Sequence, residues 1–547
     1  MSGGITFEML LNADPEVWRR AAQGWDQLGR RADDRSDDYA SSARRIPDVW
    51  ESGPAASAAQ QHCDGLRKEL ETVFPPVSTI AQTLAQHAND VSELRTRAQD
   101  LVTQGRAAHV TINPDGSMTM DPAHANEWTA RAMSQLVWQR DALLRQAAEL
   151  DGRAARAIAE NTATASGTPM SKVDRSTVPG KGTDPAEVKR WWDSLTPAQR
   201  RYVTAEYPEL VGALDGVPVA SRDVANRIVL DREQDALTAR RDELDNREAY
   251  IRSMVEQGRG AELYPGESNK VGAALTELDR IREERERIDR NLRGLDRITD
   301  RLEDPDRPRA YLIGLSTADD GRAIVSVGNP DAADNVLTYV PGTGVELSKV
   351  GGELNRNDHM AADARVADPS AETASIMWLG YDAPDSIAWN APFDGSAEGG
   401  APHLDRFQDG LRVTHDGEPS RNVVLGHSYG STVIGHTAQQ GNGINADALV
   451  FVGSPGVDTN SASDLRGVPT SEVWATRAEH DVIRRVPDWD IAHGNDPTRE
   501  DFGGRVFTSD PGDPDNEGKT HSAYWDEANL ARENIALIVT GQTGKVS

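Results

Sequence analysis

The stretch Val423-Val-Leu-Gly-His-Ser-Tyr-Gly-Ser-Thr-Val-Ile-Gly435 decides the fold of the second half of this 547-residue chain. An apolar run, a Gly-x-Ser-x-Gly pentapeptide and a run of small residues follow one another, which predicts a strand, a sharp turn and a helix. Gly426 and Gly430 permit the turn, and the turn holds Ser428 in a strained backbone conformation above the sheet edge. The motif therefore predicts Ser428 as a nucleophile, with the dipole of the following helix directed at a developing oxyanion.

Short apolar and β-branched runs recur on both sides of this stretch, bounded by Gly, Pro and Asp. Several are continuously apolar, which is typical of strands buried on both faces of a mostly parallel sheet with helices between them. We therefore expect an α/β domain with a mostly parallel sheet over residues 306–547. The predicted strands are 311–317, 323–327, 336–340, 375–379, 422–425, 448–452, 472–476 and 505–508.

A nucleophilic serine needs an acid and a base, which in this fold follow it in the order serine, acid, histidine. Asp481 lies in the loop beyond the strand predicted at 472–476, where an acid can hold a histidine in the correct tautomer. Glu479 is close to it, and Asp458 after Gly453-Ser-Pro-Gly456 is the other candidate. Only position after a strand separates Asp481 from the many surface acids of this region.

His521 is the predicted general base. It follows the last predicted strand and a loop rich in Asp, Gly and Pro, and it precedes the final helix, which places it at the carboxyl edge of the sheet. Other histidines have different expected roles. His427 is the variable position of the turn, His436 lies on the next helix, and His480 and His493 are expected at the surface.

Two backbone N–H groups complete the predicted machinery. One belongs to Tyr429, immediately after the nucleophile, and the other to Thr343 in the loop Val340-Pro-Gly-Thr-Gly344. The glycines of this loop allow backbone amides to approach a substrate oxygen. The alternative is that Pro-Gly-Thr-Gly forms a tight turn and nothing more.

Several segments together resemble an uncharacterised actinobacterial α/β-hydrolase family, which is similar in pattern to cutinase-like and lipase-like serine esterases. A helical segment from Trp191-Trp192 to Asn226 resembles the upstream part of that family, so the resemblance spans residues 185–547. The other matching segments are Gly328 to Asp334, Val340 to Gly344, Trp378 to Pro384, Gly426 to Ser431, Gly453 to Gly456 and His521-Ser-Ala-Tyr-Trp525.

This resemblance implies hydrolysis of a small-molecule ester or lipid through an acyl-enzyme, without a metal or an organic cofactor. An amidase or peptidase uses the same triad and oxyanion, so that activity stays open. The segment 384–404, which contains Ile387, Trp389 and Phe393, is either a lid over the acyl chain or a surface excursion.

Upstream of residue 306 the chain has helical periodicity. We expect a helical domain over 1–160 with a β-hairpin near 109–120, a linker at 161–184 rich in Ser, Thr, Gly and Pro, and a helical segment at 185–305. Within the last segment, residues 222–303 are highly charged with nearly balanced signs, which favours an exposed helical hairpin.

The turn Trp50-x-x-Gly53 resembles the helical-hairpin proteins of type VII secretion, although their motif is Trp-x-Gly. This resemblance implies a helical-hairpin partner protein. It also suggests an alternative function, a secretion-linked interaction protein whose hydrolase domain is inactive. Tyr202-Val-Thr-Ala-Glu206 matches a secretion-associated pattern, but it falls within the hydrolase-like segment and is interpreted as incidental.

Composition excludes several other classes of protein. The chain has 59 basic and 88 acidic residues, a net charge of −29, and the part after residue 310 carries a net charge of −20. Nucleic acid and anionic membranes are therefore unsuitable partners. The single cysteine, Cys63, excludes intramolecular disulfides and thiolate-rich metal sites, and a buried or semi-buried helical thiol is expected. With no apolar run of membrane length and no signal-peptide pattern, we expect a cytoplasmic protein or one exported without a cleavable signal.

Overall fold

The structure is a computed structural model that describes residues 5–44, 59, 63, 72–165, 171–267, 269–384, 394–485 and 493–547. The chain divides into two compact units. Unit 1 comprises Met1–Lys172 with Leu195–Tyr202, and unit 2 comprises Val173–Ser194 with Val203–Ser547. The Trp50-x-x-Gly53 turn and the apolar residues Ile387, Trp389 and Phe393 lie outside the described residues.

Unit 1 is built from long helices, with α5 packed against both α2 and α6. A two-stranded antiparallel hairpin joins α5 to α6, and Gly116 at its turn has a φ of 82°, which favours glycine. Apolar side chains from α1, α5, α6 and the hairpin form one core. The elements are α1 (Phe7–Leu11), α2 (Pro15–Arg44), α5 (Phe74–Ala107), β1 (Val110–Ile112), β2 (Met118–Met120) and α6 (Glu127–Ala165).

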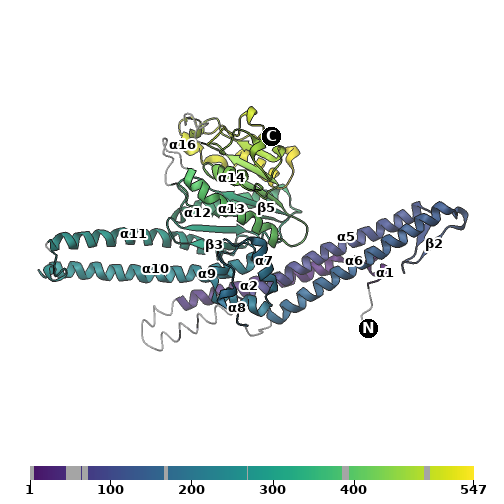
Figure 1. The fold of residues 1–547 in the computed structure, drawn as a ribbon, viewed down its shortest axis with the longest axis horizontal. Coiled ribbons are helices and arrows are strands. Elements are labelled where there is room, and N and C mark those ends of the chain that lie inside the picture. The colour runs from purple at the N-terminus through teal and green to yellow at the C-terminus, as the bar shows by residue number, and fades with distance from the viewer. Residues whose placement is uncertain are drawn as a thin grey trace. The chain divides into compact units, whose positions relative to one another are not determined.

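Unit 2 begins with short helices and a long helical hairpin (Figure 1). Helices α10 and α11 pack through an apolar stripe that includes Leu244, Ile251 and Ile281. Salt bridges cross between them, among them Arg247 to Glu277 at 2.7 Å, which accounts for the balanced charge of this region. The helices are α7 (Pro185–Ser194), α8 (Pro197–Glu206), which crosses the unit boundary, α9 (Pro208–Val211), α10 (Val219–Glu256) and α11 (Lys270–Leu302).

An eight-stranded sheet forms the centre of unit 2, in the order β10-β9-β8-β7-β5-β6-β4-β3. It is parallel from β10 to β6, and β4 runs antiparallel to both β6 and β3. The predicted mostly parallel α/β fold is confirmed. The strands are β3 (Ala310–Ser316), β4 (Arg322–Val327), β5 (Asn335–Val340), β6 (Thr373–Leu379), β7 (Arg421–His427), β8 (Ala448–Val452), β9 (Val473–Thr476) and β10 (Arg505–Val506).

Helices cover both faces of this sheet, as two adjacent residues of β5 demonstrate. Tyr339 donates a 2.5 Å hydrogen bond to Glu353 of α12, whereas Thr338 accepts one of 2.9 Å from Gln408 of α13. Because neighbouring strand residues point to opposite faces, α12 and α13 lie on opposite sides. Helix α17 packs with α12, and α14 packs with α13. These helices are α12 (Val350–Ala367), α13 (Asp394–Thr414), α14 (Gly430–Gln439), α16 (Glu517–Thr520) and α17 (Leu530–Val539).

Two buried carboxylates fasten the start of α10 to the sheet domain. Asp223 is fully buried and accepts hydrogen bonds from the Leu312 amide at 2.7 Å and from Arg309 at 3.1 Å. Asp331 accepts hydrogen bonds from the Val219 amide and the Thr414 hydroxyl, each at 2.6 Å, so it links α10 to the end of α13. Among the described residues, no helix is both long enough and apolar enough to cross a bilayer.

We expect Asp331 to make unit 2 less stable as the pH rises. Burial raises the pKa of Asp331 to about 7. Since this folded-state pKa exceeds the unfolded value of about 3.9, the folded protein binds the proton more tightly, and stability falls as the pH rises from about 4 to about 7. Asp331→Asn should therefore gain about 3 kcal/mol relative to wild type between pH 5 and pH 8.

Urea unfolding followed by tryptophan fluorescence at the two pH values measures this gain. Asp526→Asn, at an exposed carboxylate, is the matched control and should show no such change. A constant difference between Asp331→Asn and wild type across this range would contradict the prediction.

Candidate active site

Ser428 lies immediately after β7, at the turn into α14, and has a φ of 53°. This left-handed backbone is uncommon outside glycine and costs about 1–2 kcal/mol. The glycines two positions away allow the turn: a Cβ at Gly426 would lie 2.6 Å from the Ser431 nitrogen, and one at Gly430 would lie 2.2 Å from the Val340 oxygen. The Ser428 amide donates a 3.0 Å hydrogen bond to Val452 of β8.

Asp481 and His521 form a buried pair in the loops beyond β9 and β10. The Nδ1 atom of His521 lies 2.8 Å from Oδ1 and 3.0 Å from Oδ2 of Asp481. The carboxylate also accepts a 2.6 Å hydrogen bond from the Tyr524 hydroxyl and one of 2.8 Å from the Ile483 amide. Both side chains are almost fully buried, so water does not weaken the interaction between them.

The other ring nitrogen of His521, Nε2, is buried and has no hydrogen-bond partner in the part of the chain that the structure describes. No direct hydrogen bond joins Ser428 to His521 between these described residues. His427, the residue before Ser428, contacts His521. Its Nε2 lies 2.8 Å from the His521 carbonyl oxygen, and the two ring centroids are 4.9 Å apart. In sites without substrate, the bond between nucleophile and base is often long and shortens when substrate binds.

His427 is a neutral hydrogen-bond donor at this position. Burial, followed by the neighbouring His521 and Arg356, lowers the pKa of His427 well below its usual value. A neutral imidazole that faces a carbonyl oxygen must carry its proton on Nε2, so His427 donates to the backbone of His521. Behind it, Arg356 stacks over Trp525, whose ring also contacts His427 edge-on.

The loop after β5 approaches the nucleophile very closely. A Cβ added to Gly342 would lie 2.7 Å from Cβ of Ser428. The loop is anchored by the Tyr381 hydroxyl, which donates to the Pro341 carbonyl at 2.7 Å, and by the Gly344 amide, which donates to Pro384 at 2.7 Å. Between these anchors, the Thr343 amide has no hydrogen-bond partner among the described residues.

The other residues considered for the acid and the base contact different side chains. Asp458 pairs with His436, whose Nε2 is 3.4 Å from the carboxylate, rather than with His521. His493 is buried, with its ring perpendicular to that of Tyr429 at a centroid distance of 6.0 Å, so it is not the surface residue that was expected. Tyr429 follows Ser428, and its hydroxyl accepts a 3.2 Å hydrogen bond from the Ala397 amide.

Sequence reasoning did not single out Tyr524 or assign a role to His427. Tyr524 lies in the segment His521-Ser-Ala-Tyr-Trp525. Its position three residues after the predicted base was the sequence feature that could have identified it as part of the site. Its hydroxyl both donates to Asp481 and accepts a 2.9 Å hydrogen bond from the Ala478 amide. Burial and the adjacent Asp481 raise the pKa of Tyr524, which keeps the hydroxyl protonated as a donor.

One group of possible metal ligands lies in unit 1, where His109, Asp121 and His124 are exposed and close together. The two imidazoles stack with ring centroids 3.8 Å apart and planes 3° apart. Ring nitrogens coordinate in the plane of the ring, so two parallel, stacked rings do not converge on one ion as they are placed here.

These features define the chain's C-terminal part as an α/β-hydrolase domain, and residues 316–491 match the family described as alpha/beta hydrolase. The chain is 30% identical over 410 residues to the uncharacterized protein Rv2079 of Mycobacterium tuberculosis, covering 68% of this chain and 58% of that protein. It is 34% identical over 192 residues to the uncharacterized protein Mb0988c of Mycobacterium bovis, covering 33% of this chain and 71% of that protein.

The chain therefore belongs to the family of these mycobacterial proteins. It spans 58% of the length of the longer-matching relative. No solved structure matches the chain.

The strained backbone at Ser428 predicts an unusual order of variant stability. Within a helix, a glycine variant is less stable to unfolding than the alanine variant by about 1 kcal/mol. At a position with a left-handed backbone, glycine instead removes the steric cost that alanine retains. Ser428→Gly should therefore be at least as stable as Ser428→Ala, and Ser431→Gly in α14 should be about 1 kcal/mol less stable than Ser431→Ala. Thermal unfolding of the four variants measures both differences. The same order at both positions would contradict this prediction.

Proposed function

We propose that this protein is a serine hydrolase that cleaves carboxylic esters. The observation that carries the proposal is the buried Asp481–His521 pair, whose histidine contacts His427, the residue before a serine in a left-handed turn at the end of β7. A carboxylate bound to one imidazole nitrogen, with the other nitrogen unpaired, favours a histidine that acts as a general base. The α/β-hydrolase family match supports hydrolysis as the reaction class.

In the proposed reaction, the Ser428 Oγ attacks the substrate's acyl carbonyl while the Nε2 of His521 accepts the hydroxyl proton. Asp481 orients the imidazole and stabilises its positive charge. The amides of Thr343 and Tyr429 donate to the tetrahedral oxyanion. His521 then protonates the leaving alcohol, and a water molecule activated by His521 releases the acid from the acyl-enzyme.

Esters are favoured over amides by the resemblance to cutinase-like and lipase-like enzymes in the segments around residues 340–344, 426–431 and 521–525. An amidase or peptidase would use the same groups, because both reactions pass through the same oxyanion. Turnover of p-nitrophenyl esters of increasing chain length, compared with matched p-nitroanilides, separates the two activities and reports the preferred acyl length.

We expect a fluorophosphonate probe to label wild-type protein at Ser428 and not to label Ser428→Ala. His521→Ala and Asp481→Asn should reduce kcat for ester hydrolysis by at least about 10⁴-fold, since each removes part of one proton-transfer unit. Asp458→Asn is the matched control, because that carboxylate pairs with His436, and it should retain activity. Equal labelling of wild type and Ser428→Ala would exclude the proposed nucleophile.

Tyr524 should act as a positioning residue for Asp481. Tyr524→Phe removes a hydrogen bond to a charged acceptor, a contact worth about 1.5–3 kcal/mol, so kcat should fall about tenfold while KM stays unchanged. Tyr250→Phe, at an exposed tyrosine of α10, is the control. A change in KM with an unaltered kcat would instead indicate a role in substrate binding.

A second proposal concerns unit 1, which we propose binds a helical partner protein. Its helix α6 exposes two large aromatic side chains, with Trp128 61% exposed and Trp138 68% exposed. Exposed tryptophans are typical of protein interfaces. A link to type VII secretion would be contradicted if the protein were absent from culture supernatant under conditions that export known substrates of that system.

A further inference from the structure

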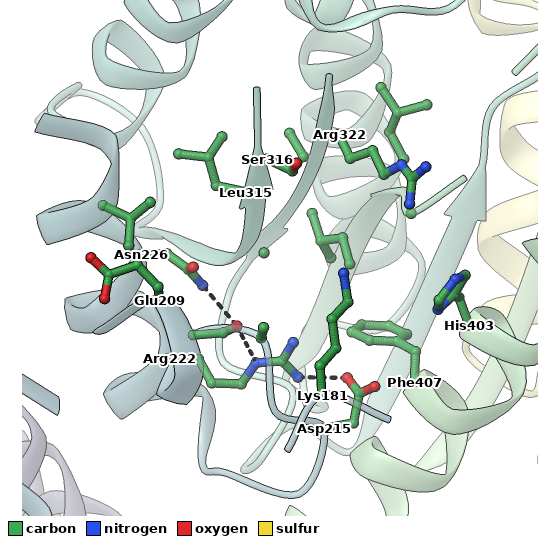
Figure 2. A pocket seen from close by; sticks show the side chains of 18 of the residues that line it. Lys181, Glu209, Asp215, Arg222, Asn226, Leu315, Ser316, Arg322, His403 and Phe407 are labelled. Carbon is green, nitrogen blue, oxygen red and sulfur yellow. Dashed lines mark hydrogen bonds and ion pairs between the residues drawn. The ribbon is translucent and has the colours of Figure 1, made fainter. Parts of the chain in front are cut away.

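A cavity opens beside the edge strands β3 and β4 of the sheet in unit 2, and the proposed nucleophile does not line it. Its volume is about 390 Å³, within the range of small-molecule sites. Its walls come from the start of α10, from β3 and β4, from the end of β6 and from α13 (Figure 2). None of Ser428, Asp481 and His521 lines it, so this cavity is a site distinct from the proposed catalytic centre.

Several nitrogen-bearing side chains line this cavity, among them Lys181, Arg322, His403 and Arg406. Figure 2 shows the charged ends of Lys181 and Arg322 on the same side of the cavity as His403. Burial lowers the pKa of His403, and the positive charges of Arg406, Lys181 and Arg322 lower it further. His403 is therefore a neutral side chain within reach of three cations, and its Nδ1 lies 2.6 Å from Arg406.

The acidic residues that line the cavity already have other partners. Asp215 pairs with the buried Arg222 at 2.9 Å, and Glu233 accepts a 2.6 Å hydrogen bond from the Thr317 hydroxyl. Glu209 forms an ion pair with Arg232. Each of these carboxylates therefore already has a partner, and the negative charge of Asp215 also acts on His403, whose pKa it raises against the effect of the cations.

The cations themselves have weak compensation. The nearest carboxylate to Arg322 is that of Asp319, at 4.0 Å and with 70% of its side chain exposed, so solvent screens the pair. Lys181 is exposed, and its side chain forms no hydrogen bond or ion pair with the residues that the structure describes, so water solvates its ammonium group. Four Lys and Arg side chains and three carboxylates line the cavity, so its lining is slightly positive whereas the chain after residue 310 carries a net charge of −20.

The remaining wall of the cavity is apolar. Trp378 and Phe407 are almost fully buried, with ring centroids 6.3 Å apart and planes tilted by 47°. Ile324, Leu315 and Val229 continue the apolar surface. A cavity with a cationic rim and an apolar wall fits a ligand that carries one anionic group and a hydrocarbon part. We call it the cationic pocket.

We propose that the cationic pocket binds a small amphipathic carboxylate. Its carboxylate lies between Lys181 and Arg322, and its hydrocarbon part packs against the apolar wall. A guanidinium and an ammonium provide charge-assisted hydrogen bonds to the two carboxylate oxygens. The neutral His403 adds a polar contact without further charge.

Isothermal titration calorimetry with octanoate tests this assignment on the full chain. Wild-type protein should bind one octanoate per chain saturably, and Lys181→Gln and Arg322→Gln should each weaken binding about tenfold, because each removes a charge-assisted contact. Lys545→Gln, at an exposed lysine near the end of the chain, is the matched control and should bind like wild type.

A ligand series separates the two halves of the site. Shortening octanoate by one methylene should weaken binding about fourfold, and octanol and octylamine should bind at least about tenfold more weakly than octanoate, because they lack the anion. Equal affinity of wild type, Lys181→Gln and Arg322→Gln would overturn the proposed site. Absence of saturable octanoate binding, or binding of octyl phosphate alone, would overturn the proposed ligand class.

Discussion

The left-handed backbone at Ser428 is the constraint on which the site depends. Three contacts hold it: the Ser428 amide bonds to β8, Gly426 abuts the start of α14, and Gly430 abuts the loop after β5. Each contact requires a backbone at a distance that a side chain would prevent. The strain of one residue is thus balanced by the packing of the sheet and of the helix that follows it. A serine in this conformation projects beyond the strand ends, where the loops from β5, β9 and β10 meet.

Buried carboxylates organise much of the rest of unit 2. The domain after residue 310 contains 36 acidic residues. Among those that the structure describes, Asp331, Glu353 and Asp481 are buried, and each accepts more than one hydrogen bond. Asp331 joins two helices and Asp481 holds His521, while Asp223, just upstream in α10, ties that helix to β3. An unpaired buried carboxylate is costly, so each of these positions orders the groups around it.

The sequence was informative where the signal is local. The eight strands, the turn at Ser428 and the order of the elements follow from short runs of residues, because a fully buried strand must be apolar along its length. Contacts between segments far apart in the sequence could not be predicted in this way. The antiparallel placement of β4 between β6 and β3 depends on contacts between distant segments. The residues that flank Asp331 in the sequence likewise do not indicate its hydrogen bonds with Val219 and Thr414. Tyr524 was within a quoted segment, but its partner Asp481 is 43 positions away.

The cationic pocket and the proposed catalytic centre lie at the same edge of the sheet, separated by β5. Trp378, in the wall of the pocket, stacks on Tyr381 with planes 11° apart, and Tyr381 stacks on Tyr429 with planes 18° apart. Tyr429 follows Ser428, and Tyr381 anchors the loop that approaches it. A ligand that displaces Trp378 therefore acts on a packed aromatic series that ends at the turn. Because protein interiors contain few voids, Trp378, Tyr381 and Tyr429 form a continuous packed contact between the wall of the cationic pocket and the turn at Ser428.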